Sequence, residues 1–259
     1  MSTLLVVRPE QEVSAVTEYL SQSQSMPVEV MVKENLVPDL RQYPKLRCWR
    51  KRQLVKLAAS RVLASDYCFT FATEVLGTRL TNRSELLPVG EALLQHESRA
   101  LYQPLWFSST SLLCIDQAVG DSYRGMSITL TLLTRDLLKI FMDALSKRRV
   151  SSAERLCRSH PPWSPPNWTP ARFRCRWWTE YSLYNLFAPV IGAFDGFNIE
   201  RGSNHLLQAL LGHEAYPFKE CQPACAFSSA DPVLCCLVDI TPGLSPRVIW
   251  AAVRASTPG

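Results

Sequence analysis

Residues Trp49–Leu80 read WRKRQLVKLAASRVLASDYCFTFATEVLGTRL. In the first half, apolar side chains recur at three- and four-residue steps, which predicts an amphipathic helix. The apolar stripe consists of Leu54, Leu57, Ala58, Val62 and Leu63. The cations fall mostly off this stripe, as on a solvated helix face, and are Arg50, Lys51, Arg52, Lys56 and Arg61. The short aromatic run 67–71 predicts a buried strand, and Glu74 lies in the turn that follows. In α/β proteins, ligands bind outside the carboxyl ends of such strands.

The segments before this stretch predict a strand–helix–strand unit. We expect a strand over Thr3–Val7, a helix over Glu10–Gln22 and a second strand over Val28–Val32, paired in parallel through a right-handed crossover. The helix has Val13, Val16, Thr17 and Leu20 on one side. Residues Asn35–Pro44, with two prolines, predict an irregular connector.

The segments after it predict further helices and strands. Thr134 is expected to cap a helix over Leu137–Leu145, with Asp136 favourably placed in the first turn. Other elements are expected near Glu85–Leu87 (helix or loop), Glu91–His96 (strand), Pro104–Ile115 (helix), Val233–Ile240 (strand) and Pro246–Ala255 (helix or strand).

Length and composition indicate a globular protein. A chain of 259 residues, 47% hydrophobic and 20% charged, suffices for one large α/β domain or two small ones. We predict a single domain over residues 1–259. No apolar run approaches the roughly 18 residues that a membrane span needs. The segment Met1–Glu10 lacks a basic lead and a long apolar core, so it does not resemble a signal peptide, and we expect a cytoplasmic protein.

Nine cysteines raise the question of disulfides or zinc. We expect buried thiols at Cys48, Cys68 and Cys114. Towards the end of the chain, Cys221, Cys225, Cys235 and Cys236 match the paired Cys-x-x-Cys spacing of zinc sites poorly, so buried thiols are favoured there too.

The net charge of +5 is concentrated locally. Residues 147–176 contain eight Lys or Arg, one acid and five prolines, which predicts a stiff basic loop. Two interpretations are equally supported: a flap that meets phosphate or an anionic membrane surface, and a solvated connector.

The central stretch resembles a bacterial family of unknown function predicted to have the GT-A glycosyltransferase fold. The family pattern is Trp-Arg-Arg-Gln-Gln-Leu-Leu-Lys-Leu-Ala-Ala, followed by a strand that ends Leu-Asp-Ala-Asp-Val. The matching residues here are Trp49, Arg50, Gln53, Leu54, Lys56, Leu57, Ala58 and Ala59. The Asp-Ala-Asp triplet falls on Ala72-Thr73-Glu74, so one acid of the metal-binding pair is replaced and Glu74 is the remaining candidate ligand. The strand at Thr3–Val7 aligns with the family's second strand, which implies that the first strand–helix unit is missing.

Two further segments carry the resemblance. Arg124–Thr129 is similar to the family's Gly-His-Gly-Met-Gly-Val-Thr-Pro segment, in which glycine lets the backbone approach the donor, and it retains Gly125 and Met126. The segment Trp178–Tyr184, WTEYSLY, is close to identical to the family's signature and is the most specific match. In a GT-A-like site, Glu180 at the start of this helix would be the general base for the acceptor hydroxyl. The alternative role for Glu180 is stabilisation of the helix N-terminus.

The resemblance implies an α/β GT-A-like domain with a Rossmann-like, mostly parallel twisted sheet flanked by helices. It also implies transfer of a sugar from a nucleotide-sugar to a hydroxyl acceptor such as a glycan, with Mn²⁺ or Mg²⁺ as cofactor. Beside Glu74 as metal ligand and Glu180 as catalytic residue, the residues predicted to bind the donor are Arg50, Gln53, Lys56, Arg79, Gly125 and Met126. His205 or His213 could also serve the metal, although surface histidines are commoner.

The alternative function is a catalytically inactive GT-A-like protein that binds a nucleotide, a glycan or a protein partner, in line with the incomplete acid pair. Nucleic-acid binding by the basic loop, through Trp163, Trp168 and Phe173, ranks last because these aromatic residues serve equally well to pack the loop on the domain.

Overall fold

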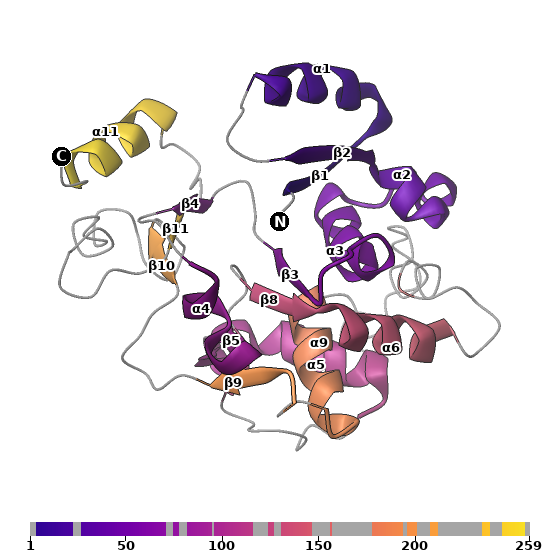
Figure 1. Ribbon diagram of the computed structural model, residues 1–259. Coiled ribbons are helices and arrows are strands. Elements are labelled where there is room, and N and C mark those ends of the chain that lie inside the picture. Colours follow the sequence, from indigo (N-terminus) through magenta and orange to yellow (C-terminus); the bar gives the residue numbers. More distant parts are fainter. Residues whose placement is uncertain are drawn as a thin grey trace, which may run out of the picture. The chain divides into compact units, whose positions relative to one another are not determined.

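The computed structural model shows a mixed α/β chain in which helices predominate (Figure 1). It describes residues 4–22, 27–70, 75–77, 82–94, 96–115, 124–126, 131–146, 156, 178–193, 196–200, 208–211, 235–238 and 245–256. The chain divides into two compact units. The first contains residues 1–68, 102–120 and 134–188, and the second contains residues 69–101, 121–133 and 189–259. The predicted single domain over residues 1–259 stays a prediction.

The first unit opens with the predicted strand–helix–strand arrangement. Strand β1 (Leu4–Arg8) pairs in parallel with β2 (Val28–Val32), and Leu4 lies opposite Val28. Helix α1 (Glu10–Ser21) packs against β2 (Figure 1). Its Val13, Val16 and Leu20 are half-buried, whereas Thr17 is exposed. The parallel pairing and the three elements are therefore confirmed to within about a residue at each end.

The connector predicted at Asn35–Pro44 is partly helical. Helix α2 (Lys33–Leu36) and a 3₁₀ helix (Pro38–Gln42) occupy it, and Leu36, Val37 and Leu40 are buried. Pro38 opens the 3₁₀ helix because its fixed φ suits a first helical position, where the missing N–H costs nothing. Pro38 thus begins a short helix here instead of preventing one.

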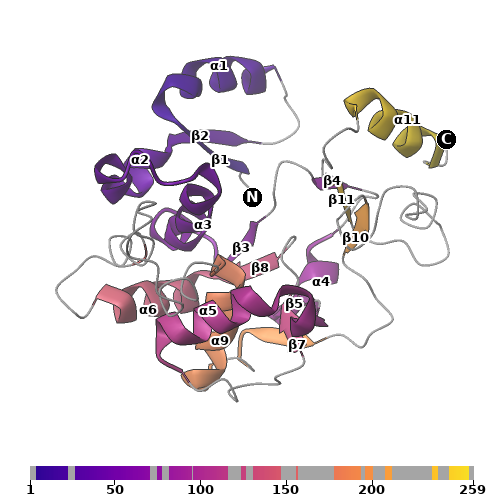
Figure 2. The same cartoon turned by 180° about the vertical axis from the view of Figure 1, so that it is seen from behind.

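The rest of the first unit is built from α3 (Cys48–Ala58), α5 (Gln103–Leu113), α6 (Arg135–Ser146) and α9 (Glu180–Val190). Helices α5, α6 and α9 lie together in both views (Figures 1 and 2). Phe141 of α6 meets Phe187 of α9 edge to face, with ring centroids 5.1 Å apart. The largest fully buried side chains of this unit are Leu54, Leu57, Leu137, Leu138, Phe141, Leu156, Trp178, Tyr181 and Tyr184.

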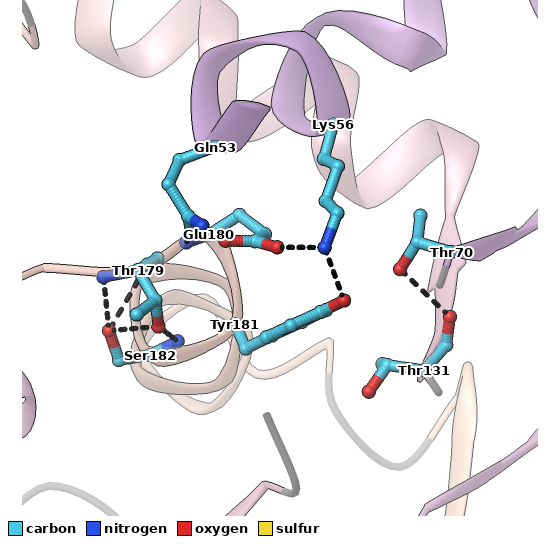
Figure 3. A network of polar contacts seen from close by, with 8 residues as sticks. All are labelled: Gln53, Lys56, Thr70, Thr131, Thr179, Glu180, Tyr181 and Ser182. Carbon is cyan, nitrogen blue, oxygen red and sulfur yellow. Dashed lines mark hydrogen bonds and ion pairs between the residues drawn. The ribbon is translucent and has the colours of Figure 1, made fainter. Parts of the chain in front are cut away.

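The central helix is shorter than its apolar pattern predicts. A 3₁₀ turn (Ala59–Arg61) follows α3, so Val62 lies beyond the helical stripe and its side chain is 41% exposed. Strand β3 (Tyr67–Thr70) comes next, but Phe69 is 37% exposed, so the strand is not buried throughout as predicted. It pairs with β8 (Thr131–Thr134), and the Thr70 hydroxyl donates to the Thr131 carbonyl at 3.2 Å (Figure 3).

One of the later helices begins where its sequence indicates, and another ends earlier than predicted. Helix α6 starts directly after Thr134 with Asp136 in its first turn, as predicted. Helix α5 ends at Leu113, where Cys114 takes a left-handed φ of 56°. The amide of Cys114 donates to the Ser111 carbonyl and that of Ile115 to the Thr110 carbonyl, which is the bonding pattern of a Schellman C-cap. The helix predicted through Ile115 is therefore stopped two residues earlier.

In the second unit, the described strands form small separate sheets. Strand β5 (Ala92–Leu94) is fully buried and pairs in parallel with β9 (Asn198–Glu200). Strand β6 (His96–Ser98) pairs antiparallel with β7 (Arg124–Met126). Strand β11 (Cys235–Val238) lies between β10 (Gln208–Leu211), which is parallel to it, and β4 (Val75–Gly77), which is antiparallel.

This arrangement confirms the α/β class but not the finer prediction of one mostly parallel sheet. Within the described residues the sheets contain two or three strands, and the pairs are of both directions. The remaining elements are α4 (Arg83–Leu86), a 3₁₀ turn (Pro88–Gly90), a 3₁₀ helix (Arg99–Tyr102) and α11 (Pro246–Ser256). Asn82 begins α4 with a capping box, in which its side chain accepts from the Glu85 amide.

Candidate active site

Two cations of α3 are turned inward. The buried face of this helix consists of Arg50, Gln53, Leu54, Leu57 and Ala58, spaced three and four residues apart. The sequence pattern places both Arg50 and Lys56 on a solvated face, and for these two residues it is wrong. Arg50 is 7% exposed, and the Lys56 side chain is 19% exposed. Arg52 does lie on the exposed face.

Lys56 is paired with Glu180, the first residue of α9 (Figure 3). The Lys56 Nζ lies 2.8 Å from Glu180 Oε1 and donates to the Tyr181 hydroxyl at 2.9 Å. Glu180 has no exposed surface and Tyr181 is 2% exposed. A buried carboxylate needs such a cation, because taking an unpaired charge out of water costs several kcal/mol.

The backbone at the start of α9 is held by α3 as well. The Gln53 Oε1 accepts from the Glu180 amide at 3.0 Å. The Arg50 guanidinium donates to the Trp178 carbonyl and lies between two indole rings, 4.6 Å from the Trp49 centroid and 4.5 Å from that of Trp178. A planar guanidinium can stack on aromatic rings in this way while its edge still donates hydrogen bonds.

Thr179 is the N-cap of α9, a position at which threonine is favoured. Its Oγ1 accepts from the Ser182 amide at 3.0 Å, and the Ser182 Oγ accepts from the Thr179 amide at 2.9 Å. This reciprocal pair is a capping box with serine at the third helical position. The Ser182 hydroxyl also lies 2.7 Å from the Ser109 hydroxyl of α5. Glu180 is therefore not needed as a cap, and its side chain is directed to Lys56 instead (Figure 3).

Burial and the neighbouring Glu180 set the pKa values of the two cations, Lys56 and Arg50. Burial alone would lower the pKa of Lys56, but the charge of Glu180, Tyr181 and the hydrogen bonds to both raise it above its ordinary value. Burial lowers the pKa of Arg50 to about 9, in part opposed by Glu180, so Arg50 stays cationic at neutral pH. Both cations therefore carry their charge at neutral pH.

One oxygen of the Glu180 carboxylate is not paired with Lys56. Among the described residues, Glu180 Oε2 has no hydrogen-bond partner, although the side chain is fully buried. A buried acceptor without a partner costs about 1–3 kcal/mol, so native proteins rarely keep one without a use for it. This oxygen is a free acceptor next to a fixed positive charge.

The described residues do not form a metal site. Within them, no three His, Cys, Asp or Glu side chains come together in a way that could hold a metal ion. Glu180 also faces the cation Lys56, and a second positive charge would be repelled there. The predicted metal ligand Glu74 lies outside the described residues.

The structure brings together four of the predicted site residues: Arg50, Gln53, Lys56 and Glu180. Gly125 and Met126 lie on β7, opposite Glu97 and His96 of β6, and belong to the second unit. Arg79, His205, His213 and most of the basic loop 147–176 fall outside the described residues, as do Cys221 and Cys225. The roles assigned to all of these residues stay predictions.

Sequence reasoning missed Tyr181 and the Trp178 ring as members of the cluster. Both stand inside the WTEYSLY signature, so the signal was present in the motif, whereas nothing in the sequence indicates Ser109.

The thiols are also placed differently from the prediction. Cys48 and Cys114 are exposed, Cys68 is half-buried, and all three are free. Burial raises the pKa of the Cys68 thiol to about 11, partly opposed by Lys56.

No helix in the described part of the chain is both long and apolar enough to cross a membrane. The chain matches no curated protein. The model of one protein family matches residues 1–258, which is nearly the full length, and this confirms the prediction of a family whose function is unknown. The chain therefore belongs to the Family of unknown function (DUF6492).

Proposed function

We propose that this protein is a GT-A-like glycosyltransferase that transfers a sugar from a nucleotide-sugar to an acceptor hydroxyl, with Glu180 as the general base. The cluster of α3 and α9 supports the proposal because it joins the two segments that most resemble the glycosyltransferase-like family. The observation that carries it is the unpartnered Oε2 of the fully buried Glu180, beside an oxygen already fixed by Lys56.

In this mechanism the acceptor hydroxyl donates its proton to Glu180 Oε2 as its oxygen attacks the anomeric carbon of the donor sugar. The bond between that carbon and the phosphate oxygen breaks, and the nucleoside diphosphate leaves with the electron pair. The Lys56 ammonium, 2.8 Å from Oε1, fixes the orientation of the carboxyl group so that Oε2 is left for the acceptor hydroxyl. Arg50 and Lys56 supply positive potential near the base, as preorganised charges do in many transferases.

The proposal also requires movement. Because Glu180 has no exposed surface, the residues that cover it must move aside when the acceptor binds. Closure around a substrate and exclusion of water are common in transferases, so this requirement is a testable property of the site.

The second candidate is a non-catalytic GT-A-like protein that binds a nucleotide or glycan. The full burial of Glu180 favours it, because the Lys56–Glu180 pair could then serve only to fasten α3 to α9. Under this alternative, the unpaired Oε2 destabilises the fold without serving any function, and no transfer takes place.

The experiment first measures thermal shifts with uridine, guanosine and cytidine diphosphates, with and without Mn²⁺. The matching nucleotide-sugars are then assayed for release of the diphosphate by wild type, Glu180→Gln and the control Glu10→Gln, an exposed first-turn acid of α1. The proposal expects a loss of about 100-fold or more for Glu180→Gln, with nucleotide binding retained, and no change for Glu10→Gln. Binding without turnover in wild type supports the second candidate, and a lack of binding by all three nucleotides contradicts the transferase proposal.

A further inference from the structure

A strongly basic segment surrounds the first turn of α3. Between Leu40 and Ser65 the chain has eight Lys or Arg residues and no acid, and the segment is bounded by Asp39 and Asp66. Two of the eight, Arg50 and Lys56, belong to the buried cluster described above. We call the exposed cations Arg41, Lys45, Arg47 and Arg52 the basic end of α3.

The segment is folded compactly, with Arg41 in the 3₁₀ helix (Pro38–Gln42), Lys45 and Arg47 in the turns before α3, and Arg52 in the second turn of α3. The amide of Leu46 donates to the Tyr43 carbonyl, and that of Lys51 to the Arg47 carbonyl. The Lys51 Nζ donates to the Pro44 carbonyl at 2.9 Å, which holds the preceding turn against the helix. The charges therefore cannot spread apart along an extended chain.

These positive charges destabilise the N-terminal end of α3. The first turn of α3 contains no acid, and Arg47 at the N-cap makes no capping bond with its side chain. Cations near a helix N-terminus oppose the helix dipole, and a polar cap is the usual arrangement there. Cations kept where they are locally unfavourable point to a role outside the helix.

An aromatic side chain stands among them. Trp49 is 37% exposed, and one ring face is covered by the Arg50 guanidinium at 4.6 Å. An indole with one covered face offers little for stacking between nucleic-acid bases, but its edge can enter the headgroup region of a bilayer. Four to eight Lys or Arg clustered on or beside a helix are typical of proteins that bind anionic lipids.

We propose that the basic end of α3, together with Trp49, is a docking surface for an anionic phospholipid membrane. Arg41, Lys45, Arg47 and Arg52 meet the negative headgroups, and the Trp49 ring enters the interface between them. This surface is separate from the buried pair Lys56–Glu180, so the inference does not rest on the proposed function.

The test is co-sedimentation of the full chain with phosphatidylcholine vesicles that contain either no phosphatidylserine or roughly 30% of it, near 0.1 M salt. Wild type is expected to sediment with the anionic vesicles alone and to be released by added salt. The variant K45E/R47E is expected to lose partitioning by at least about 25-fold, since each cation near the surface contributes about fivefold. Neither side chain makes a hydrogen bond or ion pair to the other described residues, and an acid at the N-cap favours the helix, so the fold is retained.

The matched control is R83E/K139E, which reverses two exposed cations on α4 and α6 and changes the net charge equally. It is expected to alter partitioning by no more than about twofold, because its charges lie outside the docking surface. Vesicles should also shift the tryptophan emission of wild type to the blue, and this shift should be smaller in Trp49→Phe. The proposal is overturned by sedimentation with neutral vesicles, by equal losses in the two double variants, or by tighter binding of a single-stranded oligonucleotide at the same salt.

Discussion

The ammonium of Lys56 on α3 lies 2.8 Å from Oε1 of Glu180, the first residue of α9, and also donates to the Tyr181 hydroxyl. Lys56→Met keeps most of the side-chain volume but leaves the buried carboxylate without its cation. We expect the free energy of unfolding to fall by about 3 kcal/mol in chemical denaturation. Lys139→Met, on the exposed face of α6, is the control and should change it by less than about 0.5 kcal/mol.

The double variant K56M/E180Q measures the coupling of this pair. Because it removes both charges, it should be more stable than the sum of the two single changes predicts, by about 1 kcal/mol or more. Additive effects would mean that the two side chains do not stabilise each other.

Arg50→Lys tests the guanidinium held between Trp49 and Trp178. A lysine ammonium keeps the charge but cannot cover two ring faces as a flat group. We expect a loss of about 1–2 kcal/mol in the free energy of unfolding. Arg52→Lys on the exposed face serves as the matched change. Equal stabilities of the two variants would contradict a stacking role for Arg50.

The hydroxyl of Ser182 joins the cap of α9 to α5. Ser182→Ala removes the acceptor of the Thr179 amide and the partner of the Ser109 hydroxyl, both of which are buried. The expected cost is about 2 kcal/mol, measured by thermal and urea unfolding. Ser111→Ala, whose hydroxyl bonds to the Phe107 carbonyl at an exposed position, should be nearly neutral. A neutral Ser182→Ala would show that the cap does not depend on this contact.

Cys68 should react more slowly than Cys48 and Cys114 with a thiol reagent. Burial raises its pKa from 9.0 to about 11, so little thiolate is present at pH 8. Iodoacetamide labelling mapped by mass spectrometry should modify Cys48 and Cys114 well before Cys68. Lys56→Met should slow Cys68 further, because Lys56 opposes the rise of that pKa.

The same shift predicts a pH dependence of stability. A thiol with a raised pKa keeps its proton in the folded chain between pH 9 and 11, while the unfolded chain loses it. The folded state then binds more protons, so the free energy of unfolding falls as the pH rises through this window. Cys68→Ala should lessen that fall, and identical pH profiles for the two proteins would exclude the contribution.

Cys114→Gly should stabilise the end of α5. Cys114 has a φ of 56° at the position of a Schellman cap where glycine is usual, because a Cβ is unfavourable there. We expect a gain of up to about 1 kcal/mol, and no gain for Cys114→Ala, which retains the Cβ. A gain shared by both variants would assign the effect to loss of the exposed thiol instead.

The sequence was most informative where the pattern is local. The strand–helix–strand start, the Thr179 cap and the α6 helix follow from periodicity and capping chemistry within short windows. The inward direction of Arg50 and Lys56 depends on Trp178, Glu180 and Tyr181, which are distant in sequence. A periodicity argument assigns every charge to the solvent, so it cannot find a cation whose partners are supplied by another helix. The extents of the small sheets likewise depend on pairings that no local pattern specifies.

The hydrogen bond from the Glu180 amide to Gln53 has a consequence for how the chain folds. The first amides of any helix lack partners within that helix. Here the Gln53 side chain of α3 supplies the acceptor for one of them. Helix α9 can therefore complete its opening turn only once α3 has docked, which ties a local event to a long loop closure. In hydrogen exchange, weakening α3 should release the first-turn amides of α9 before those of its middle turns.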